Sequence, residues 1–260
     1  MGFDEAIGFV KEAQHIIQLS GLIKHVAGEH LARFNEGVIF IEKLNQLSFN
    51  DEQTKAALIR SKAIFLITEN EKHNISNFAN SDQIRILAAS ASADVEQRNI
   101  ERATGKFKTV LEMAKNLDEN DEANRALAVA GHNLASAIEE MSELSDTKKE
   151  LMLLAAHASR KYWQIAGTWL ETERAEYYLA KKYLKCNDYI SSIKHANLCL
   201  TICEKNTAEP LEFFFAYESI ANVEKAMGQP LRSLLKMQEQ FEKLSEADKT
   251  WCRASLVKFQ

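Results

Sequence analysis

The chain has 260 residues, of which 46% are hydrophobic and 27% are charged, a composition that excludes an intrinsically disordered protein. Its net charge of −5, with no run of five Lys or Arg residues, excludes the strong positive field that is typical of nucleic-acid-binding proteins. Only nine glycines and two prolines interrupt the chain, so turns are few and the composition predicts an all-α protein.

The cysteines and the N-terminal residues indicate a reducing compartment. The chain has four cysteines without a C-x-x-C pair, a pattern that favours free thiols over a disulfide framework. The first six residues carry two acids and no apolar signal segment, and no apolar stretch approaches the ~20 residues of a membrane span. We therefore expect a cytoplasmic protein that does not interact with membranes.

Short polar segments divide the first half of the chain. Asn50, with Gln53 three residues later, predicts a helix N-terminus of the capping-box type. Asn80-Ser81-Asp82 predicts a second helix start, and the acidic segment 118–121 separates two further helices. Residues 1–117 therefore have the rhythm of helices joined by short turns.

The second half contains the clearest amphipathic helix. Its apolar residues recur every three or four positions and form one stripe: Leu127, Ala130, Gly131, Leu134, Ala135 and Ile138. Further along, Ser145-Asp146 and Ser245 with Asp248 predict helix starts, and Asn187-Asp188 predicts a turn. Two proline segments, 207–210 and 228–230, each predict that one helix ends and that the next begins at the proline.

These signals predict a regular arrangement of helices. We expect about eleven helices of about 12 to 20 residues, joined by loops of about 2 to 6 residues, as between antiparallel neighbours. We expect one domain over residues 1–260, with the least regular stretch, 69–80, as the best candidate for a boundary.

An internal repeat is visible around three alanines. The turn residues Asn187 and Gly228 each follow an alanine, Ala180 or Ala221, by seven positions. Small residues follow the same two alanines by twelve positions, as Ser192 and Ser233. A third copy centres on Ala135, so that the three alanines are 45 and 41 residues apart.

This pattern resembles the tetratricopeptide-repeat (TPR) family over residues 121–245. The spacing is longer than the standard repeat of about 34 residues, and Glu176 and Glu224 occupy positions where the family has an aromatic residue. The resemblance implies antiparallel helical hairpins that stack into a right-handed superhelix. It also implies a concave groove, which in TPR-like proteins binds peptides or partner proteins.

The resemblance implies which residues face the groove. It places positions −6, −3, +1 and +5 from each alanine on the concave side. From these positions and the neighbouring Lys225 we predict as groove residues Arg174, Tyr177, Lys181, Lys185, Phe215, Asn222, Lys225 and His132. The three cations of the middle repeat favour an acidic peptide segment as partner. The alternative interpretation is a solvated basic helix face. The run Phe213-Phe214-Phe215 cannot point one way on a helix, so at least one of its rings should meet the groove or a neighbour.

One metal-like pattern lies on a single helix face. His195, Cys199 and Cys203 are spaced by four residues, which places the first and last about 12 Å apart at 1.5 Å per residue. One zinc ion with bonds of about 2.0–2.3 Å cannot join both ends. A two-ligand site completed by Cys186 is an alternative. We favour the interpretation that Cys199 fills a core position, as buried cysteines often do.

Other catalytic and cofactor patterns are incomplete. Glu12 and His15 form one E-x-x-H motif, but the second motif that a di-iron bundle needs is absent from the sequence. Gly105-Lys106 lacks the upstream glycine of a phosphate-binding loop. No nucleophile, base and orienting group can be assembled from the sequence. We therefore expect no enzyme activity, no cofactor and no metal.

The sequence thus predicts a scaffold or adaptor that binds a protein or peptide. Two alternatives stay open. One is a helical-bundle metal protein or enzyme. The other is a self-associating architectural protein whose groove is filled by residues 1–117 or by a second copy of the chain.

Overall fold

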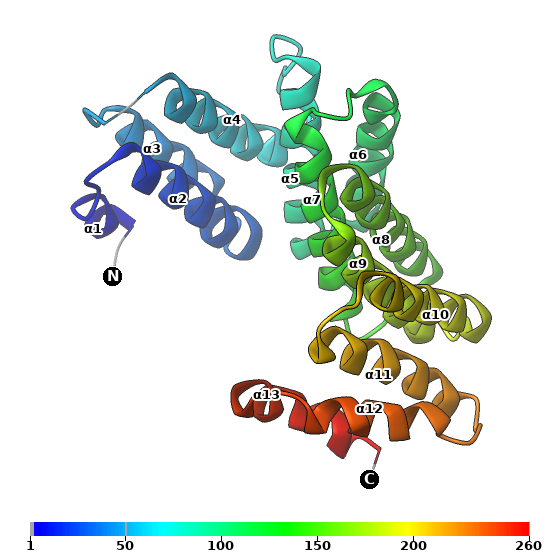
Figure 1. Ribbon diagram of the computed structural model, residues 1–260. Coiled ribbons are helices and arrows are strands. Elements are labelled where there is room, and N and C mark those ends of the chain that lie inside the picture. The colour runs from blue at the N-terminus through cyan, green and yellow to red at the C-terminus, as the bar shows by residue number, and fades with distance from the viewer. Residues whose placement is uncertain (1–2, 50, 260) are drawn as a thin grey trace. The chain divides into compact units, whose positions relative to one another are not determined.

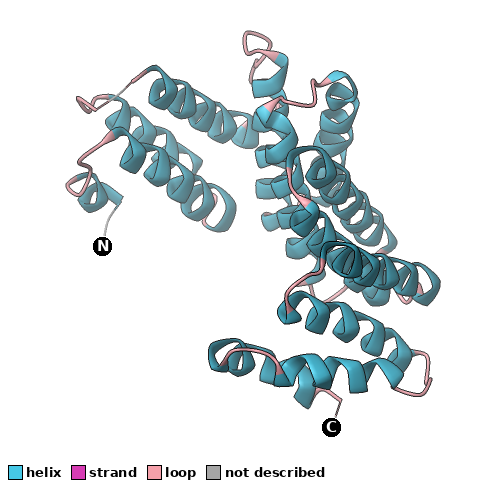
Figure 2. Cartoon of the chain, in the orientation of Figure 1, coloured by secondary structure: helices cyan, strands magenta, loops and turns pink. Residues whose placement is uncertain are grey.

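The computed structural model describes residues 3–49 and 51–259 and is all-α, as predicted (Figure 2). Thirteen α-helices, one π-helix and one short 3-10 helix occur in the described residues, and no strand occurs among them. The α-helices are thus two more than the predicted eleven. The first of them has only five residues, too few to give a periodic signal in the sequence.

Two compact units divide the chain, over residues 1–138 and 139–260. The stretch 69–80, our candidate boundary, lies inside the first unit. The helices of the first unit (Figure 1) are α1 (Phe3–Ile7), α2 (Ala13–Ile23), the π-helix η1 (Lys24–His30), α3 (Phe34–Asn45), α4 (Glu52–Glu69), α5 (Asn80–Glu96), α6 (Ile100–Met113), the 3-10 helix η2 (Ala114–Asn116) and α7 (Glu122–Glu139), whose last residue is assigned to the second unit.

The second unit continues the chain from Glu139. Its helices are α8 (Asp146–Ala166), α9 (Trp169–Lys185), α10 (Tyr189–Asn206), α11 (Pro210–Ala226), α12 (Arg232–Glu242) and α13 (Glu246–Val257). Consecutive helices pack against each other within each unit, as α3 to α6 do in the first and α8 to α13 in the second. This arrangement is compatible with a helical repeat. None of the helices in the described ranges combines the length and apolar character needed to traverse a bilayer.

Most predicted helix ends are confirmed. Ser145 and Ser245 cap α8 and α13, and Pro210 is the first residue of α11. Both predicted turn residues are left-handed, with φ of 62° at Asn187 and 63° at Gly228, a conformation that Gly and Asn adopt more readily than other residues.

Two predicted helix starts are not confirmed. Asn50 lies outside the described residues, and the neighbouring Asp51 caps α4 by accepting a 2.7 Å hydrogen bond from the backbone N–H of Thr54. The prediction that Pro230 begins a helix is wrong. The backbone N–H of Arg232 donates to the carbonyl of Pro230 at 2.8 Å, and this tight turn delays the start of α12 to Arg232.

The small residues of the repeat lie where helices approach closely. Ala135, Ala180 and Ala221 are all buried. The hydroxyl of the buried Ser192 on α10 donates to the carbonyl of Ala180 on α9 at 2.7 Å. A larger side chain at either position would separate the two helices, so the α9–α10 contact explains the small residues.

Carboxylates stand at the two positions that depart from the TPR pattern, with Glu176 buried and Glu224 half-buried. Glu176 bridges three helices, because it accepts from Arg160 Nε on α8 at 2.7 Å and contacts His195 Nδ1 on α10 at 2.6 Å. Burial favours a raised pKa for Glu176, but the hydrogen bonds from His195 and Arg160 outweigh it and lower the pKa. Glu224 accepts from the backbone N–H of Ser233 at 3.0 Å and thus holds the first turn of α12. Polar bridges therefore replace aromatic packing at both positions.

The core of the first unit is built around Phe65. This ring is buried on α4 and packs with apolar residues of α2 and α3. Gly37 on α3 lies directly against it, since a Cβ added at Gly37 would stand 2.4 Å from the ring. The glycine is therefore required by the close approach of α3 to α4.

We expect Gly37→Ala to destabilise the protein by about 1–3 kcal/mol, because the buried ring of Phe65 has no space into which to move. Gly21→Ala on α2 is the matched control. A Cβ there meets nothing within 4 Å, so this variant should be neutral or gain up to about 1 kcal/mol. Urea denaturation followed by circular dichroism measures both, and equal effects of the two substitutions would contradict this packing.

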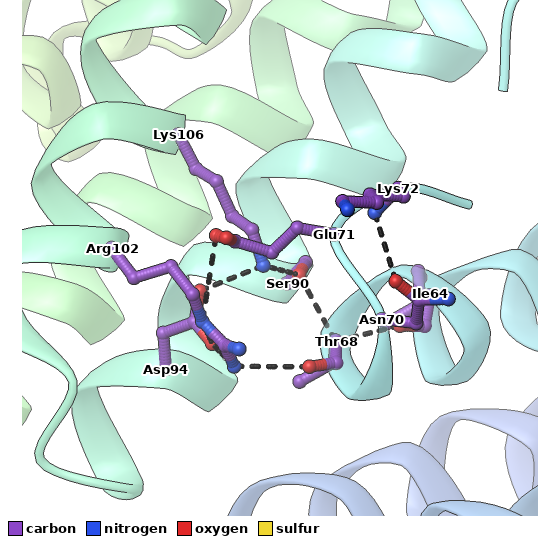
Figure 3. A network of polar contacts seen from close by, with 9 residues as sticks. All are labelled: Ile64, Thr68, Asn70, Glu71, Lys72, Ser90, Asp94, Arg102 and Lys106. Carbon is purple, nitrogen blue, oxygen red and sulfur yellow. Dashed lines mark hydrogen bonds and ion pairs between the residues drawn. The ribbon is translucent and has the colours of Figure 1, made fainter. Parts of the chain in front are cut away.

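A buried ion cluster joins α5 to α6 (Figure 3). Asp94 on α5 is 0% exposed and contacts Arg102 Nε and Lys106 Nζ on α6, each at 2.7 Å. Lys106 also donates to Ser90 Oγ at 2.6 Å, and Arg102 Nη2 donates to the carbonyl of Thr68 on α4 at 2.9 Å. Lys106, part of the incomplete phosphate-loop motif, therefore has a structural role.

We expect Asp94→Asn to destabilise the protein by about 3–5 kcal/mol, because it leaves the charges of Arg102 and Lys106 without their buried partner. Glu239→Gln, which removes the exposed pair with Lys236, should leave the stability nearly unchanged, because water screens the pair. Thermal denaturation of both variants tests this prediction. An Asp94→Asn variant with unchanged stability would show that the ion cluster does not stabilise the protein.

Candidate functional site

Two cavities, one in each unit, are the candidate sites. The cavity of the second unit has a volume of about 330 Å³ and lies between α9, α11 and Trp251 of α13. Four of the eight predicted groove residues line it: Arg174, Tyr177, Lys181 and Phe215. We call this cavity the aromatic groove, because Tyr177, Tyr178, Phe215 and Trp251 form its walls.

The aromatic rings of the groove contact one another. The ring centroids of Tyr177 and Phe215 are 5.7 Å apart, and those of Phe215 and Trp251 are 5.1 Å apart. Phe215 thus meets the groove, as expected for one ring of the phenylalanine run, while Phe214 is buried. Trp251 is 64% exposed. Sequence reasoning missed it because position 251 lies beyond the repeat match, which ends at 245.

The charges of the aromatic groove are largely compensated within the chain. Arg174 Nη2 donates to Glu212 Oε1 at 2.7 Å, and the hydroxyl of Tyr177 donates to Glu218 Oε2 at 2.7 Å. Burial and the charge of Glu218 raise the pKa of Tyr177, so the phenol keeps its proton. Lys181 Nζ lies over the ring of Tyr177, 5.4 Å from its centroid. The groove is therefore aromatic and nearly neutral.

The other four predicted groove residues do not line this cavity. Lys185 is exposed at the end of α9, and Asn222 is half-buried on α11. Lys225 is exposed, and its Nζ donates to the carbonyl of Lys258 and lies 5.5 Å from the centre of the Phe259 ring. His132 lies half-buried on α7, in the first unit.

A buried cluster of two thiols and a carboxylate lies beside the aromatic groove. Cys199 Sγ donates to Glu173 Oε1 at 2.7 Å, and Cys203 Sγ lies 3.6 Å from the same oxygen. Cys199 is fully buried, as we predicted for a core position. Within the described residues the group includes neither His195, which pairs with Glu176, nor Cys186. Sequence reasoning missed Glu173 because it lies on another helix.

The larger cavity belongs to the first unit and has a volume of about 880 Å³. Residues of α2, η1, α3, α4, α5 and α7 line it, including Lys24, Arg60, Arg85 and Arg125. We call it the cationic cavity. Its remaining surface is small or apolar and includes Ile17, Ala57, Ile64, Ala89 and Ala126.

Lys24 is the exceptional residue of the cationic cavity. It is half-buried and forms no ion pair or hydrogen bond through its ammonium group with the residues that the structure describes. Burial is the main cause that lowers the pKa of Lys24, and the charges of Arg60 and Arg85 lower it further, although Glu29 acts in the opposite direction. The cavity thus holds a desolvated ammonium group beside two other cations.

The neighbouring charges have partners of their own. Arg60 pairs with Asp82 at 3.2 Å, and Arg85 pairs with Glu122 at 3.3 Å. Glu29, the nearest carboxylate in sequence, contacts His25 at 2.6 Å. The charge of Lys24 is therefore the least compensated of this group.

A π-helix carries Lys24 into the cavity. In η1 the backbone N–H of Leu31 donates to the carbonyl of Val26, five residues earlier, at 3.1 Å. Such segments are rare and are frequently found at functional sites. Nothing in the sequence signalled η1. The cationic cavity was not signalled either, because it is lined by side chains of six helical segments that come together only in the fold.

Comparison with known proteins identifies no family: no protein-family model matches the sequence, and no curated protein matches it.

We expect Lys24→Gln to stabilise the protein by about 1 kcal/mol at pH 7, because it removes an uncompensated, half-buried charge. The pKa of Lys24 is lowered from 10.5 in the folded protein, so its buried charge destabilises the protein fully at any pH below the folded pKa. This destabilisation disappears as the pH rises towards 10.5. The advantage of the variant should therefore shrink with rising pH. Lys55→Gln, at an exposed lysine paired with Glu52, is the control. A destabilised Lys24→Gln variant would contradict the account.

Proposed function

We propose that the protein is a cytoplasmic, TPR-like binding protein that recognises an acidic segment of a partner protein. The buried alanines at the repeat positions and the close α9–α10 contact support the repeat assignment and, with it, a right-handed stack of helical hairpins. The free state of all four cysteines is consistent with a reducing compartment. Binding, not catalysis, is the function that this proposal assigns.

One observation carries the proposal: Lys24 lies in an 880 Å³ cavity, beside Arg60 and Arg85, without an ion pair to the described residues. A buried charge that is unpaired costs stability, and a carboxylate from outside the chain would remove that cost. The chain thus keeps a destabilising charge where a ligand can reach it, which is typical of a binding site.

The shape and composition of the cationic cavity favour a peptide. Its volume is near the upper end of the range of about 300–1,000 Å³ for ligand pockets. Small residues on two of its walls, Ala57 and Ser61 on α4 and Ala126 and Ala130 on α7, leave room for bulky side chains of a ligand. The apolar residues Ile17 and Ile64 would contact apolar side chains that flank the acid.

The aromatic groove is a second candidate site within the same function. It brings together four of the predicted residues, and Trp251 exposes an aromatic surface of the kind that often anchors peptides. Because its cations are compensated or stacked on rings, it fits an apolar or aromatic side chain better than an acidic one.

Binding of fluorescent peptides, measured by anisotropy, tests the proposal. The peptides should contain Asp or Glu beside Leu or Phe, and matched peptides should carry Asn or Gln in place of each acid. We expect the acidic peptides to bind and the amide peptides to bind at least about 10-fold more weakly, because charge-assisted hydrogen bonds contribute about 1.5–3 kcal/mol each. The difference should shrink at high salt.

Matched variants assign the site. Lys24→Gln should weaken binding by about 10-fold or more, whereas Lys55→Gln should have no effect. Trp251→Ala and the triple variant Arg174→Glu, Lys181→Glu, Lys185→Glu test the aromatic groove. Loss of binding only in these two would move the site to the second unit. Equal binding of acidic and amide peptides would refute recognition of an acidic segment.

A further inference from the structure

The buried cluster of Glu173, Cys199 and Cys203 has the geometry of a metal site. One oxygen and two sulfurs, one atom from each residue, lie within 4.8 Å of one another, and all three residues are buried. A tetrahedral zinc ion with bonds of about 2.0–2.3 Å holds its ligand atoms roughly 3.5–3.8 Å apart. Shifts of about 1 Å, within the reach of side-chain rotation, would therefore bring the three atoms to zinc distances.

Local structure brings these ligands together. Cys199 and Cys203 are four residues apart on α10, so their sulfurs lie on one face of the helix. Glu173 reaches them from α9, which packs against α10 along its length. Tyr177, Phe213 and Ala216 surround the thiols with an apolar shell. Such a shell excludes water and strengthens the interaction of a cation with charged ligands.

Glu173 lacks the partners that a buried carboxylate requires. It is 1% exposed, and its Oε2 has no hydrogen-bond partner among the described residues. The neighbouring Arg174 pairs with Glu212 and not with Glu173. Oε1 accepts only from two weak thiol donors and Oε2 has no partner, so the described residues leave the carboxyl group of Glu173 incompletely hydrogen-bonded.

We propose that Glu173, Cys199 and Cys203 bind one Zn²⁺ ion, with a water molecule as the fourth ligand. Two thiolates select a borderline-soft ion such as Zn²⁺ over Mg²⁺ or Ca²⁺, which prefer oxygen ligands. Binding forms two Zn–S bonds and one Zn–O bond to Glu173 in exchange for water molecules of the hydrated ion, of which one stays as the fourth ligand. It releases to solvent the two thiol protons and any proton on Glu173, and no oxidation is involved.

The aromatic groove provides a path by which an ion can reach the site. Glu173 lines the aromatic groove, so the ion would enter from that side. His195 is not one of the proposed ligands. The distance between His195 and Cys203, which is too long for one zinc ion to join, therefore does not affect the site. The site depends on the four-residue spacing of the cysteines and on α9. It is independent of the proposed recognition of an acidic segment.

Metal titration of the purified full-length chain tests the proposal. The chain, stripped with a chelator, is titrated with Co²⁺ as a spectroscopic substitute and then with Zn²⁺. We expect one ion per chain, the near-ultraviolet charge-transfer band of thiolate ligands, and displacement of Co²⁺ by Zn²⁺. Release of about two protons per ion, measured in weakly buffered solution, is expected from the two thiols.

Variants distinguish a zinc site from cysteines that only fill the hydrophobic core. Cys199→Ser, Cys203→Ser and the isosteric Glu173→Gln should each weaken Zn²⁺ binding by more than the roughly 10- to 100-fold that loss of an outer-shell partner costs. Cys252→Ser, at another buried thiol, and Cys186→Ser should bind as the wild type does. Glu173→Gln keeps both thiols and remains informative if a serine variant fails to fold. No thiolate band in the wild type, or a band unchanged in folded Glu173→Gln, would overturn the proposal.

Discussion

Close contact between consecutive helices is the constraint on which the rest of the structure depends. A single amphipathic helix cannot bury its apolar face alone, and here α3 to α6 and α8 to α13 each pack against their neighbours along the chain. The contact requires small residues, such as Ala180 opposite Ser192, and in the first unit it requires Gly37 opposite Phe65. Once helices approach this closely, polar side chains between them are cut off from water and must find partners inside the protein.

Most buried charges in the described residues satisfy this requirement. Asp94 is held by Arg102 and Lys106, Glu176 by Arg160 and His195, and Lys182 by Glu139. These pairs join neighbouring helices and explain why charged residues occupy positions that apolar residues fill in a simpler core. Lys24 and Glu173 differ. Lys24 has no counter-ion among the described residues, and Glu173, whose pKa is raised by burial to about 7, has one oxygen without a hydrogen-bond partner among them. Our two proposals rest on these two residues, because an unpaired charge or an unpartnered buried oxygen is costly unless a ligand completes its environment.

The fold class and most helix ends could be predicted from the sequence, because they depend on local chemistry. Scarcity of Gly and Pro, the caps Ser145 and Ser245, and the left-handed turns at Asn187 and Gly228 act over a few residues. Pro230 shows the limit of such rules, because a local turn to Arg232 moved the helix start by two residues.

The site could be predicted only in part. The repeat spacing predicted four residues that line one cavity in the structure: Arg174, Tyr177, Lys181 and Phe215. It could not predict that Glu212 pairs with Arg174 or that Trp251 lines the same cavity. The cationic cavity and the Glu173 cluster depend on contacts between residues up to about a hundred positions apart in sequence. Periodicity along one helix carries no information about which helix lies opposite.

Hydrogen–deuterium exchange of the full chain, with and without a saturating acidic peptide, tests the central claim most directly. The account predicts slower exchange in η1 and in the cavity-facing parts of α4 and α5, with little change in α9 and α11. Protection confined to α9, α11 and α13, or no protection at all, would contradict the claim that the cationic cavity of the first unit binds the partner.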